Sequence, residues 1–310
     1  MREIERVSII GLGAIGAAFA AEARVPEGTL RVIAGGARGE KLRRDGMEIN
    51  GRRRRFTVVD PSETVEPADL LIIAVKFGQL AQAIEDSRNH VGDDTVILSV
   101  LNGISSEEVV GRAFGREKLL YSYCVGTDAM NNGDSRTYSA VYTIPFGEAK
   151  NTPGAYSENV LRVQRFFERA NIKHEIPEDM LKSMWWKFMM NMGVNQSLAV
   201  TRQPYRALQH KGRVYALARD TMLEAVAVAQ REGIALEPED AERAFAVIGT
   251  ISPDGKPSTL QDIEAKRPTE IEIFSGDLLR LAEKHGMSLP VNEVLYRAIK
   301  GIEQEYTATE

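Results

Sequence analysis

Three polar side chains interrupt the apolar stretch WKFMMNMGVNQS at intervals of four residues: Lys187, Asn191 and Asn195. In an α-helix, residues four apart lie on one face, so this polar ladder is predicted to line a single stripe. The apolar residues around it are typical of a buried helix. Buried amide and ammonium groups need partners, which a bound ligand would supply. The alternative is an amphipathic helix whose polar stripe faces water.

A glycine-rich segment follows the apolar run VSII and opens an alanine-rich helical pattern. It comprises Gly11, Leu12, Gly13, Ala14, Ile15 and Gly16. In a strand, turn and helix, the first glycine permits a tight turn, the second lets backbone approach a pyrophosphate, and the third allows close packing of helix on strand. The helix N-terminus attracts the phosphates. The segment predicts a dinucleotide site, and a glycine turn that serves packing alone is the alternative.

The end of the next predicted strand bears on which dinucleotide binds. Sites for NAD usually place an acidic residue there, about 20 residues after the glycines, to bond the ribose 2′-hydroxyl. The sequence LRVIAGGARGEKL has two glycines at the strand end, then Arg38, with Lys41 one turn later. A guanidinium accommodates a 2′-phosphate. We therefore expect NADP(H), the alternative being that Arg38 is only a solvent-exposed side chain.

Two further polar residues follow short apolar runs. Lys76 comes directly after the run IIAV, and Asn102 comes directly after the run ILSVL and is followed by Gly103. Open α/β sheets bind ligands at the carboxyl ends of their strands, so both residues are candidates for the cofactor site. A plain strand exit at Lys76 and an Asn-Gly turn at Asn102 are the alternatives.

Residues 1 to about 120 alternate short apolar runs with helical patterns. The runs are unalternated and bounded by turn residues, as is typical of parallel strands buried on both faces. This order predicts an α/β fold with a Rossmann-type dinucleotide-binding domain. Residues 119–148 add β-branched and aromatic strands around an Asn-Asn-Gly turn at 131–133, and we expect them to close the sheet.

From Ser157 onward the apolar period becomes that of a helix, and several helical patterns end at a glycine. A chain of 310 residues exceeds the usual size of a single core. Because the segment IPED supplies a break, we place the boundary after Pro177. The expected domains are an NADP-binding Rossmann-type domain at 1–177 and a largely α-helical substrate and catalytic domain at 178–310.

The composition argues against several classes of partner. A net charge of -5 disfavours nucleic-acid binding, and the short basic run Arg52–Arg55 is expected to be a solvated edge hairpin. No segment approaches the roughly 18 apolar residues of a membrane span. The N-terminus shows no secretory signal, so we expect a cytoplasmic protein. The oligomeric state stays open, with a homodimer among the alternatives.

Neither cysteine nor histidine suggests a metal site. The single cysteine, Cys124, excludes an internal disulfide and a thiolate cluster, and its strand-like setting favours a buried thiol. The four histidines are scattered, and none has a second ligand at helical spacing.

Taken together, the motifs resemble those of the ketopantoate reductase family over nearly the whole chain. In order, they are GLGAIG, AVKFGQ, LNG, WKFMMNMGVN and STLQDIEAKRPTEIEIFSG. The resemblance implies NADPH-dependent reduction of 2-dehydropantoate to pantoate, a step of pantothenate and coenzyme A biosynthesis. The chain departs from the family pattern at Leu101, where the family often has Gln, and in NQSLAV after the ladder. Both departures bear on the shape of the substrate pocket.

The resemblance also implies roles for single residues. The ladder lysine, Lys187, would contact the substrate ketone and donate a proton, and the two ladder asparagines would bind substrate. Ser258 of STLQD would bind substrate as well, and Glu270 of TEI would be an active-site carboxylate. Lys76 and Asn102 match positions near the cofactor.

Ser258 and Glu270 also have purely structural explanations. The sequence STLQ fits a capping box, with Ser258 as the helix N-cap. On one straight helix the two residues would lie roughly 18 Å apart, too far to share a small substrate. Pro268 is therefore expected to interrupt the helix, so that a new helix starts with Glu270 in its first turn. There Glu270 could be only a favourable acid near a helix N-terminus.

Reduction of a ketone by NADPH delivers hydride to the carbonyl carbon while charge builds on the oxygen, so a cation must meet that oxygen. Lys187 can polarise the carbonyl and donate a proton, and a carboxylate such as Glu270 would keep the lysine protonated. Two other functions stay open. One is a reductase of the same family that acts on a different 2-oxo acid. The other is a non-catalytic NADP(H) sensor, which would not need Lys187 and Glu270 together.

Overall fold

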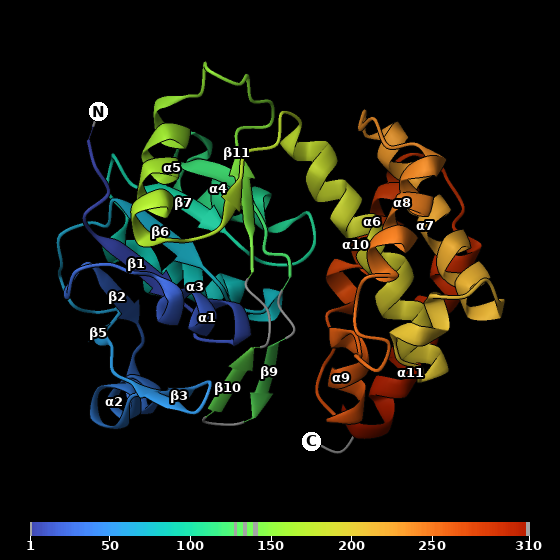
Figure 1. Ribbon diagram of the computed structural model, residues 1–310, viewed down its shortest axis with the longest axis horizontal. Helices are drawn as coiled ribbons and strands as arrows, with labels where there is room; N and C mark the ends of the chain where they lie inside the picture. The colour runs from blue at the N-terminus through green and yellow to red at the C-terminus, as the bar shows by residue number, and fades with distance from the viewer. Residues whose placement is uncertain (1, 127–128, 133–134, 139–141, 308–310) are drawn as a thin grey trace. The chain divides into compact units, whose positions relative to one another are not determined.

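The apolar runs near the N-terminus form the centre of a large sheet. The computed structural model describes residues 2–126, 129–132, 135–138 and 142–307 (Figure 1). The chain divides into two compact units. Unit 1 comprises Met1–Asn102 and Ser106–Leu181, and unit 2 comprises Gly103–Ser105 and Lys182–Glu310.

Unit 1 is built on an eight-stranded sheet in the order β12-β11-β8-β7-β6-β1-β2-β5. The strands are β1 (Val7–Ile10), β2 (Leu30–Ile33), β5 (Thr57–Val59), β6 (Leu70–Ile73), β7 (Val96–Ser99), β8 (Leu119–Ser122), β11 (Ile144–Gly147) and β12 (His174–Glu175). Six adjacent strands of this sheet pair in parallel, in the order β8, β7, β6, β1, β2 and β5, whereas β11 runs antiparallel to β8. The strand order reverses at β1, which has β2 on one side and β6 on the other.

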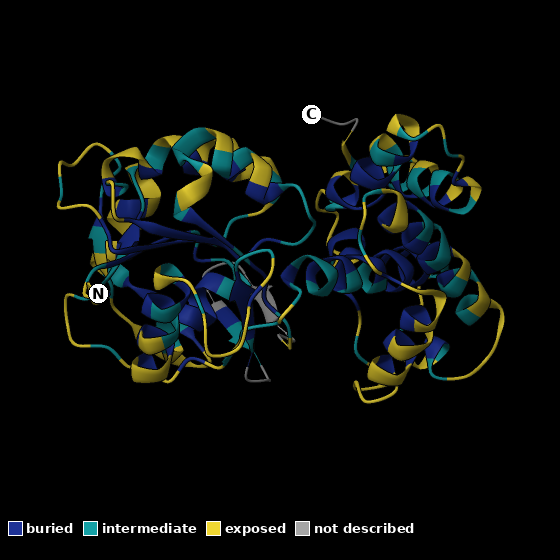
Figure 2. Cartoon of the chain, turned by 90° about the horizontal axis from the view of Figure 1, so that it is seen from above, coloured by how far each residue is buried: buried dark blue, intermediate teal, exposed yellow. Residues whose placement is uncertain are grey.

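Helices cover both faces of this sheet (Figure 2). Successive side chains of a strand point to opposite faces, so each central strand contributes apolar residues to two cores. Val7 and Ile9 of β1 pack with helices α1 (Ala14–Glu22) and α5 (Glu158–Ala170). Ile10 packs on the other side with α3 (Leu80–Ser87) and α4 (Ser106–Phe114). The short connections η1 (Phe77–Gln79), η2 (Arg88–His90) and η3 (Arg116–Lys118) are 3₁₀ turns. The predicted Rossmann-type domain is confirmed.

A second, four-stranded sheet corrects one expectation. Its order is β4-β3-β10-β9, with β3 (Met47–Ile49), β4 (Arg52–Arg54), β9 (Ala129–Asn132) and β10 (Ser135–Tyr138). The strands of residues 119–148 therefore do not all close the large sheet: β8 and β11 do, but β10 pairs with β3, beyond the end of α2 (Gly36–Asp45). Of the turn expected at 131–133, the first two residues lie in β9 and Gly133 lies outside the described residues. The basic run forms an edge strand, as expected.

Unit 2 is largely helical, which confirms the second part of the fold prediction. Its elements are α6 (Met180–Thr201), η4 (Tyr205–Leu208), α7 (Arg213–Arg231), α8 (Pro238–Ile248), α9 (Ser258–Glu264), η5 (Ile271–Ile273), α10 (Ser275–Lys284) and α11 (Pro290–Thr307). One apolar core joins α6, α7, α8 and α10. Among the described residues, no helix combines the length and the apolar character needed to cross a membrane.

Candidate active site

The glycine-rich segment lies between β1 and α1, and its three glycines differ in what requires them. Gly11 has a φ of +94°, which strongly favours glycine. A Cβ on Gly16 would lie 1.9 Å from the Gly11 carbonyl oxygen, so close packing requires that glycine too. A Cβ on Gly13 would meet nothing closer than 3.9 Å. Packing alone therefore accounts for two glycines but not for Gly13, the position at which backbone would approach a pyrophosphate.

The start of α1 offers backbone donors to such a group. Gly13 is the N-cap of α1 and has no side chain to satisfy the first N–H groups of the helix, which include those of Ala14, Ile15 and Gly16. Unpaired N–H groups and the positive end of the helix dipole both favour an anion at this place. The residues present therefore fit a dinucleotide pyrophosphate.

The other cofactor candidates in unit 1 follow from the topology. Lys76 comes after β6, and Asn102 comes after β7, while the glycine-rich segment comes after β1. Because these strands are parallel neighbours, their carboxyl ends lie at the same edge of the sheet. The strand order reverses at β1, and such a switch point is where open α/β sheets bind ligands. Lys76 is exposed and Asn102 is half-buried.

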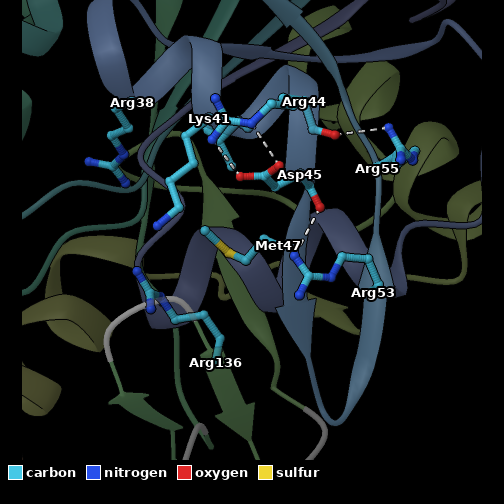
Figure 3. A pocket seen from close by; sticks show the side chains of 10 residues that line it. Arg38, Lys41, Arg44, Asp45, Met47, Arg53, Arg55 and Arg136 are labelled. Carbon is cyan, nitrogen blue, oxygen red and sulfur yellow. Dashed lines mark hydrogen bonds and ion pairs between the residues drawn. The ribbon is translucent and has the colours of Figure 1, made fainter.

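Arg38 lies in the first turn of α2, directly after β2 at the same sheet edge, and its side chain is exposed. It lines a cavity of about 1050 Å³ together with Lys41, the end of α2 and the β3–β4 hairpin (Figure 3). The cavity also includes Arg136 of β10, which sequence reasoning missed. Arg136 is 7% exposed, and its Nε donates to the carbonyl oxygen of Leu12 at 3.2 Å. Since 124 positions separate these two residues, no local pattern could indicate the contact.

The polar ladder lies on α6 and does not face water. Lys187 is 9% exposed and Asn195 is 5% exposed, while Asn191 is half-buried. The prediction of a buried helix is correct, and the alternative of a solvated stripe is wrong. Within the part of the chain that the structure describes, no other residue hydrogen-bonds the carboxamide of Asn191 or Asn195. Both carboxamides can therefore serve a ligand.

Packing within unit 2 holds α6 against its neighbours along the ladder. Gly193, between the two asparagines, is required because a Cβ there would lie 2.7 Å from the Ala218 carbonyl oxygen of α7. The rings of Phe188 and Phe274 stack at 6.3 Å between centroids. Since Phe188 follows the ladder lysine and Phe274 follows η5, this stack fastens the η5 turn to α6 beside Lys187.

Glu270 is the N-cap residue of η5 and is half-buried. The expected helix break occurs, but it differs in detail from the prediction. Helix α9 ends at Glu264, before Pro268, and Glu270 opens a 3₁₀ turn instead of the first turn of an α-helix. The structure thus brings the Glu270 turn and the ladder into one packed region of unit 2.

Ser258 corrects the capping-box interpretation. It is the first residue of α9, whereas Pro257 is the N-cap, and no side-chain cap bond forms. Gln261, the other partner of the proposed box, donates instead to the carbonyl oxygen of Lys256 at 2.9 Å. Ser258 is exposed. The helix that carries it packs through Ile263 in a cluster with Ala199, near the C-terminal end of α6.

A buried hydrogen-bond network next to Asn195 also escaped the sequence reasoning. Gln196 donates through Nε2 to the Asn292 side chain of α11 at 3.3 Å. It accepts a short hydrogen bond from the hydroxyl of Ser275, the first residue of α10. All three side chains are fully buried. The network fixes the rotation of α6 and thereby the direction of the neighbouring asparagine. A polar residue adjacent to the ladder was the only signal.

A buried carboxyl lies on α4, in the turn after Asn102. Glu107 is 3% exposed, and the hydroxyl of Ser106 donates to it at 3.0 Å. Burial raises the pKa of Glu107 to about 7, because the charged form loses its hydration. The group is therefore partly neutral near physiological pH. Elsewhere among the described residues, no cluster of three His, Cys, Asp or Glu side chains is placed to hold a metal ion.

Comparison with protein families gives two matches. Residues 7–150 match the family described as ketopantoate reductase PanE/ApbA, and residues 179–303 match the C-terminal domain of the same family. A 2-dehydropantoate 2-reductase of Shigella flexneri is 26% identical over 308 residues, which cover 97% of this chain and 96% of the relative. An uncharacterized oxidoreductase of Bacillus subtilis is 24% identical over 302 residues, covering 96% and 98%.

Solved structures show the same fold. A D-mandelate dehydrogenase with NADH and anilino(oxo)acetate has a TM-score of 0.87 at 20% identity and covers 97% of this chain and 99% of that one. A dimeric ketopantoate reductase from Staphylococcus aureus has a TM-score of 0.82 at 20% identity, with the same coverage.

Proposed function

The chain belongs to the ketopantoate reductase family (PanE/ApbA), and we propose that it reduces 2-dehydropantoate to pantoate with NADPH. At the level of the family it is an oxidoreductase that uses a nicotinamide cofactor. One observation carries the more specific proposal: one face of α6 holds the buried Lys187 and two asparagines whose carboxamides accept or donate no hydrogen bond among the described residues. A 2-oxo acid of this kind offers a ketone, a carboxylate and a hydroxyl, the groups that such side chains recognise.

The residues of unit 2 account for the protein's part in the chemistry. The reduced nicotinamide would supply hydride to the ketone carbon. Lys187 would hydrogen-bond the ketone oxygen, stabilise the negative charge that develops there and donate the proton that completes the alcohol. Asn191 and Asn195 would orient the rest of the substrate, with Ser258 as a further contact. Glu270 would favour the protonated form of Lys187, which burial by itself disfavours.

We propose NADP(H) as the cofactor. A NAD site usually carries an acidic residue at the end of the second strand, whereas this chain has two glycines there, followed by Arg38 and Lys41 in α2. The glycine-rich segment, Lys76 and Asn102 would hold the rest of the dinucleotide. The ratio of kcat/KM for NADPH to that for NADH tests the assignment, and a ratio below one would refute it.

Substitution of the ladder lysine tests the catalytic proposal. Lys187→Ala should lower kcat with 2-dehydropantoate by about 10²- to 10⁴-fold, the usual contribution of a general acid, while the Kd for NADPH stays within twofold. Lys182→Ala is the matched control, because Lys182 lies on the same helix and pairs with Asp240 at 3.6 Å. Turnover of the Lys187 variant at the wild-type rate would exclude the proposed role.

A second candidate is a reductase for a different 2-oxo acid. Leu101 stands where the family often has Gln, and the fold is shared with a D-mandelate dehydrogenase. NADPH oxidation should therefore be measured with 2-dehydropantoate, with analogues that lack its hydroxymethyl or gem-dimethyl groups, and with an aromatic 2-oxo acid. A higher kcat/KM for any of these than for 2-dehydropantoate would favour the second candidate. Tight NADPH binding without turnover of any 2-oxo acid would favour a sensor.

A further inference from the structure

The cavity beside Arg38 is strongly basic. It lies entirely in unit 1, and its lining contains six cationic side chains and one carboxylate: Arg38, Lys41, Arg44, Arg53, Arg55 and Arg136, with Asp45. Its volume of about 1050 Å³ reaches that of a site for a nucleotide-sized ligand. Such a concentration of positive charge favours a multiply charged anion.

Three of the cations already serve the C-terminal end of α2. Arg44 forms a two-bond ion pair with Asp45. Arg53 donates to the carbonyl oxygen of Asp45 at 3.0 Å, and Arg55 donates to that of Arg44 at 3.2 Å. Both carbonyls belong to the last turn of the helix, where no intrahelical donor is available. These three arginines therefore have a structural explanation.

The other three cations that line the cavity are Arg38 and Lys41 of α2 and Arg136 of β10. Arg38 and Lys41 lie three positions apart on α2, so they share a face of the helix. Figure 3 shows the head groups of Arg38, Lys41 and Arg136 on the same side of the cavity, away from Arg55. We call these three residues the phosphate cluster.

Arg136 differs from the other two because its position is fixed. Its guanidinium is buried, and one of its five N–H groups donates to the Leu12 carbonyl oxygen in the glycine-rich segment. This bond places a guanidinium next to the backbone that would bind the dinucleotide. A guanidinium can offer two parallel N–H groups to a phosphate, which a lysine cannot do.

We propose that Arg136 is a specificity-determining residue for the cofactor, and that with Arg38 and Lys41 it binds the 2′-phosphate of NADP(H). The residue comes from β10 of the small sheet, so this sheet has a function in cofactor choice as well as in covering the end of α2. The inference rests on the NADP(H) assignment of the proposed function. It does not depend on which 2-oxo acid is reduced.

The competing explanation is that Arg136 only clamps β10 to the glycine-rich segment. The two explanations differ in a measurable way. A residue that contacts the 2′-phosphate affects NADPH binding and leaves NADH binding nearly unchanged, because NADH has no such group. A clamp that shapes the glycine-rich segment affects both cofactors equally, since both contain the same pyrophosphate.

The test is the Kd of NADPH and of NADH for the full chain without substrate, measured by titration calorimetry. Arg136→Gln should weaken NADPH binding about 10- to 100-fold, the range expected for a lost hydrogen bond to a charged group, and change NADH binding less than twofold. Arg136→Lys keeps the charge without the paired donors and should give an intermediate loss. Arg52→Gln is the matched control: it removes an exposed arginine of β4 that does not line the cavity, and should leave the ratio of the two Kd values unchanged.

Equal weakening of both cofactors by Arg136→Gln, or unchanged NADPH binding, would overturn the inference. If Arg136→Gln fails to fold, the ratio measured for Arg136→Lys decides in the same way. If the proposed function is wrong but this inference is right, the wild type reduces no 2-oxo acid, yet its NADPH binding still depends on Arg136. A wild type that prefers NADH would overturn the cofactor assignment and this inference together.

Discussion

The buried carboxyl of Glu107 makes a quantitative prediction about pH and stability. In the variant Glu107→Gln, a neutral amide of the same shape replaces a carboxyl that is 3% exposed. Gln can still accept the hydrogen bond that the Ser106 hydroxyl donates at 3.0 Å. At low pH the two proteins should therefore be similar, since the wild-type carboxyl is then neutral as well.

The expected size of the effect follows from the pKa. Burial raises the pKa of Glu107 from its ordinary value of 4.5 to about 7 in the folded chain. The folded state thus binds a proton more tightly than the unfolded state, and its stability falls as pH rises from 4.5 to 7. This difference in pKa corresponds to about 3 kcal/mol at pH 8. The free energy of unfolding of Glu107→Gln should exceed that of the wild type by an amount that grows by about 2 to 3 kcal/mol between pH 5 and pH 8.

The assay must report on unit 1. Both tryptophans, Trp185 and Trp186, lie on α6 within unit 2, so their fluorescence reports on the other unit. Hydrogen exchange of peptides from β7 and β8, measured at pH 5, 6, 7 and 8 and corrected for the intrinsic rate, gives the opening free energy of the sheet itself.

Glu108→Gln is the matched control, because Glu108 is exposed and pairs with Arg112 on the surface of α4. Its effect should stay within about 0.5 kcal/mol at every pH. A difference between Glu107→Gln and wild type that does not change between pH 5 and pH 8 would refute the reasoning. So would a variant that is less stable than the wild type at pH 8.

Three further predictions concern other parts of the molecule. Gly16→Ala should destabilise unit 1, because the added Cβ would lie 1.9 Å from the carbonyl oxygen of Gly11. Gly13→Ala should fold normally, but it should bind NADPH about tenfold or more weakly than the wild type does. Calorimetric unfolding and NADPH titration test both variants, and unimpaired binding by Gly13→Ala would contradict the site. Burial lowers the pKa of His90 to about 4, so the unfolded chain takes up a proton below pH 6.5 that the folded chain does not. His90 should therefore lower the free energy of unfolding of the wild type by about 3 kcal/mol between pH 7 and pH 4, apart from the contributions of other groups. In urea titrations at a series of pH values, His90→Gln should lack this contribution, and the same pH dependence of stability in both proteins would count against it. Ser275→Ala leaves the buried amide oxygen of Gln196 without its donor, so it should lower the free energy of unfolding by about 1–3 kcal/mol. Unfolding monitored by tryptophan fluorescence measures this change, and unchanged stability would exclude a stabilising role for the network.

The sequence alone was sufficient for features that depend on near neighbours along the chain. The glycine-rich segment, the unalternated strands and the four-residue spacing of the polar ladder are all local patterns, because turn, strand and helix geometry repeat over a few residues. They predicted the Rossmann-type domain, the helical second unit and the buried ladder, and the structure confirms all three. The family resemblance then assigned roles to individual residues, and these roles stay predictions.

Local patterns failed where two conformations fit the same few residues. The sequence STLQ is compatible with a capping box, yet Pro257 takes the N-cap position, because its fixed φ and the loop before it already set the entry into α9. Strands β9 and β10 have the composition of strands in a large sheet, but β10 pairs with β3, whose edge is available beyond α2, and β9 pairs with β10.

Only the tertiary structure decided which distant residues meet. The contact of Arg136 with Leu12, the stack of Phe188 on Phe274 and the bond between Ser275 and Gln196 join residues that are 79 to 124 positions apart. Partners so far apart leave no periodicity in the sequence, since their pairing depends on how whole helices and sheets pack. The types of residue that could do chemistry are therefore visible in the sequence, whereas the side chains that surround and orient them are set by packing.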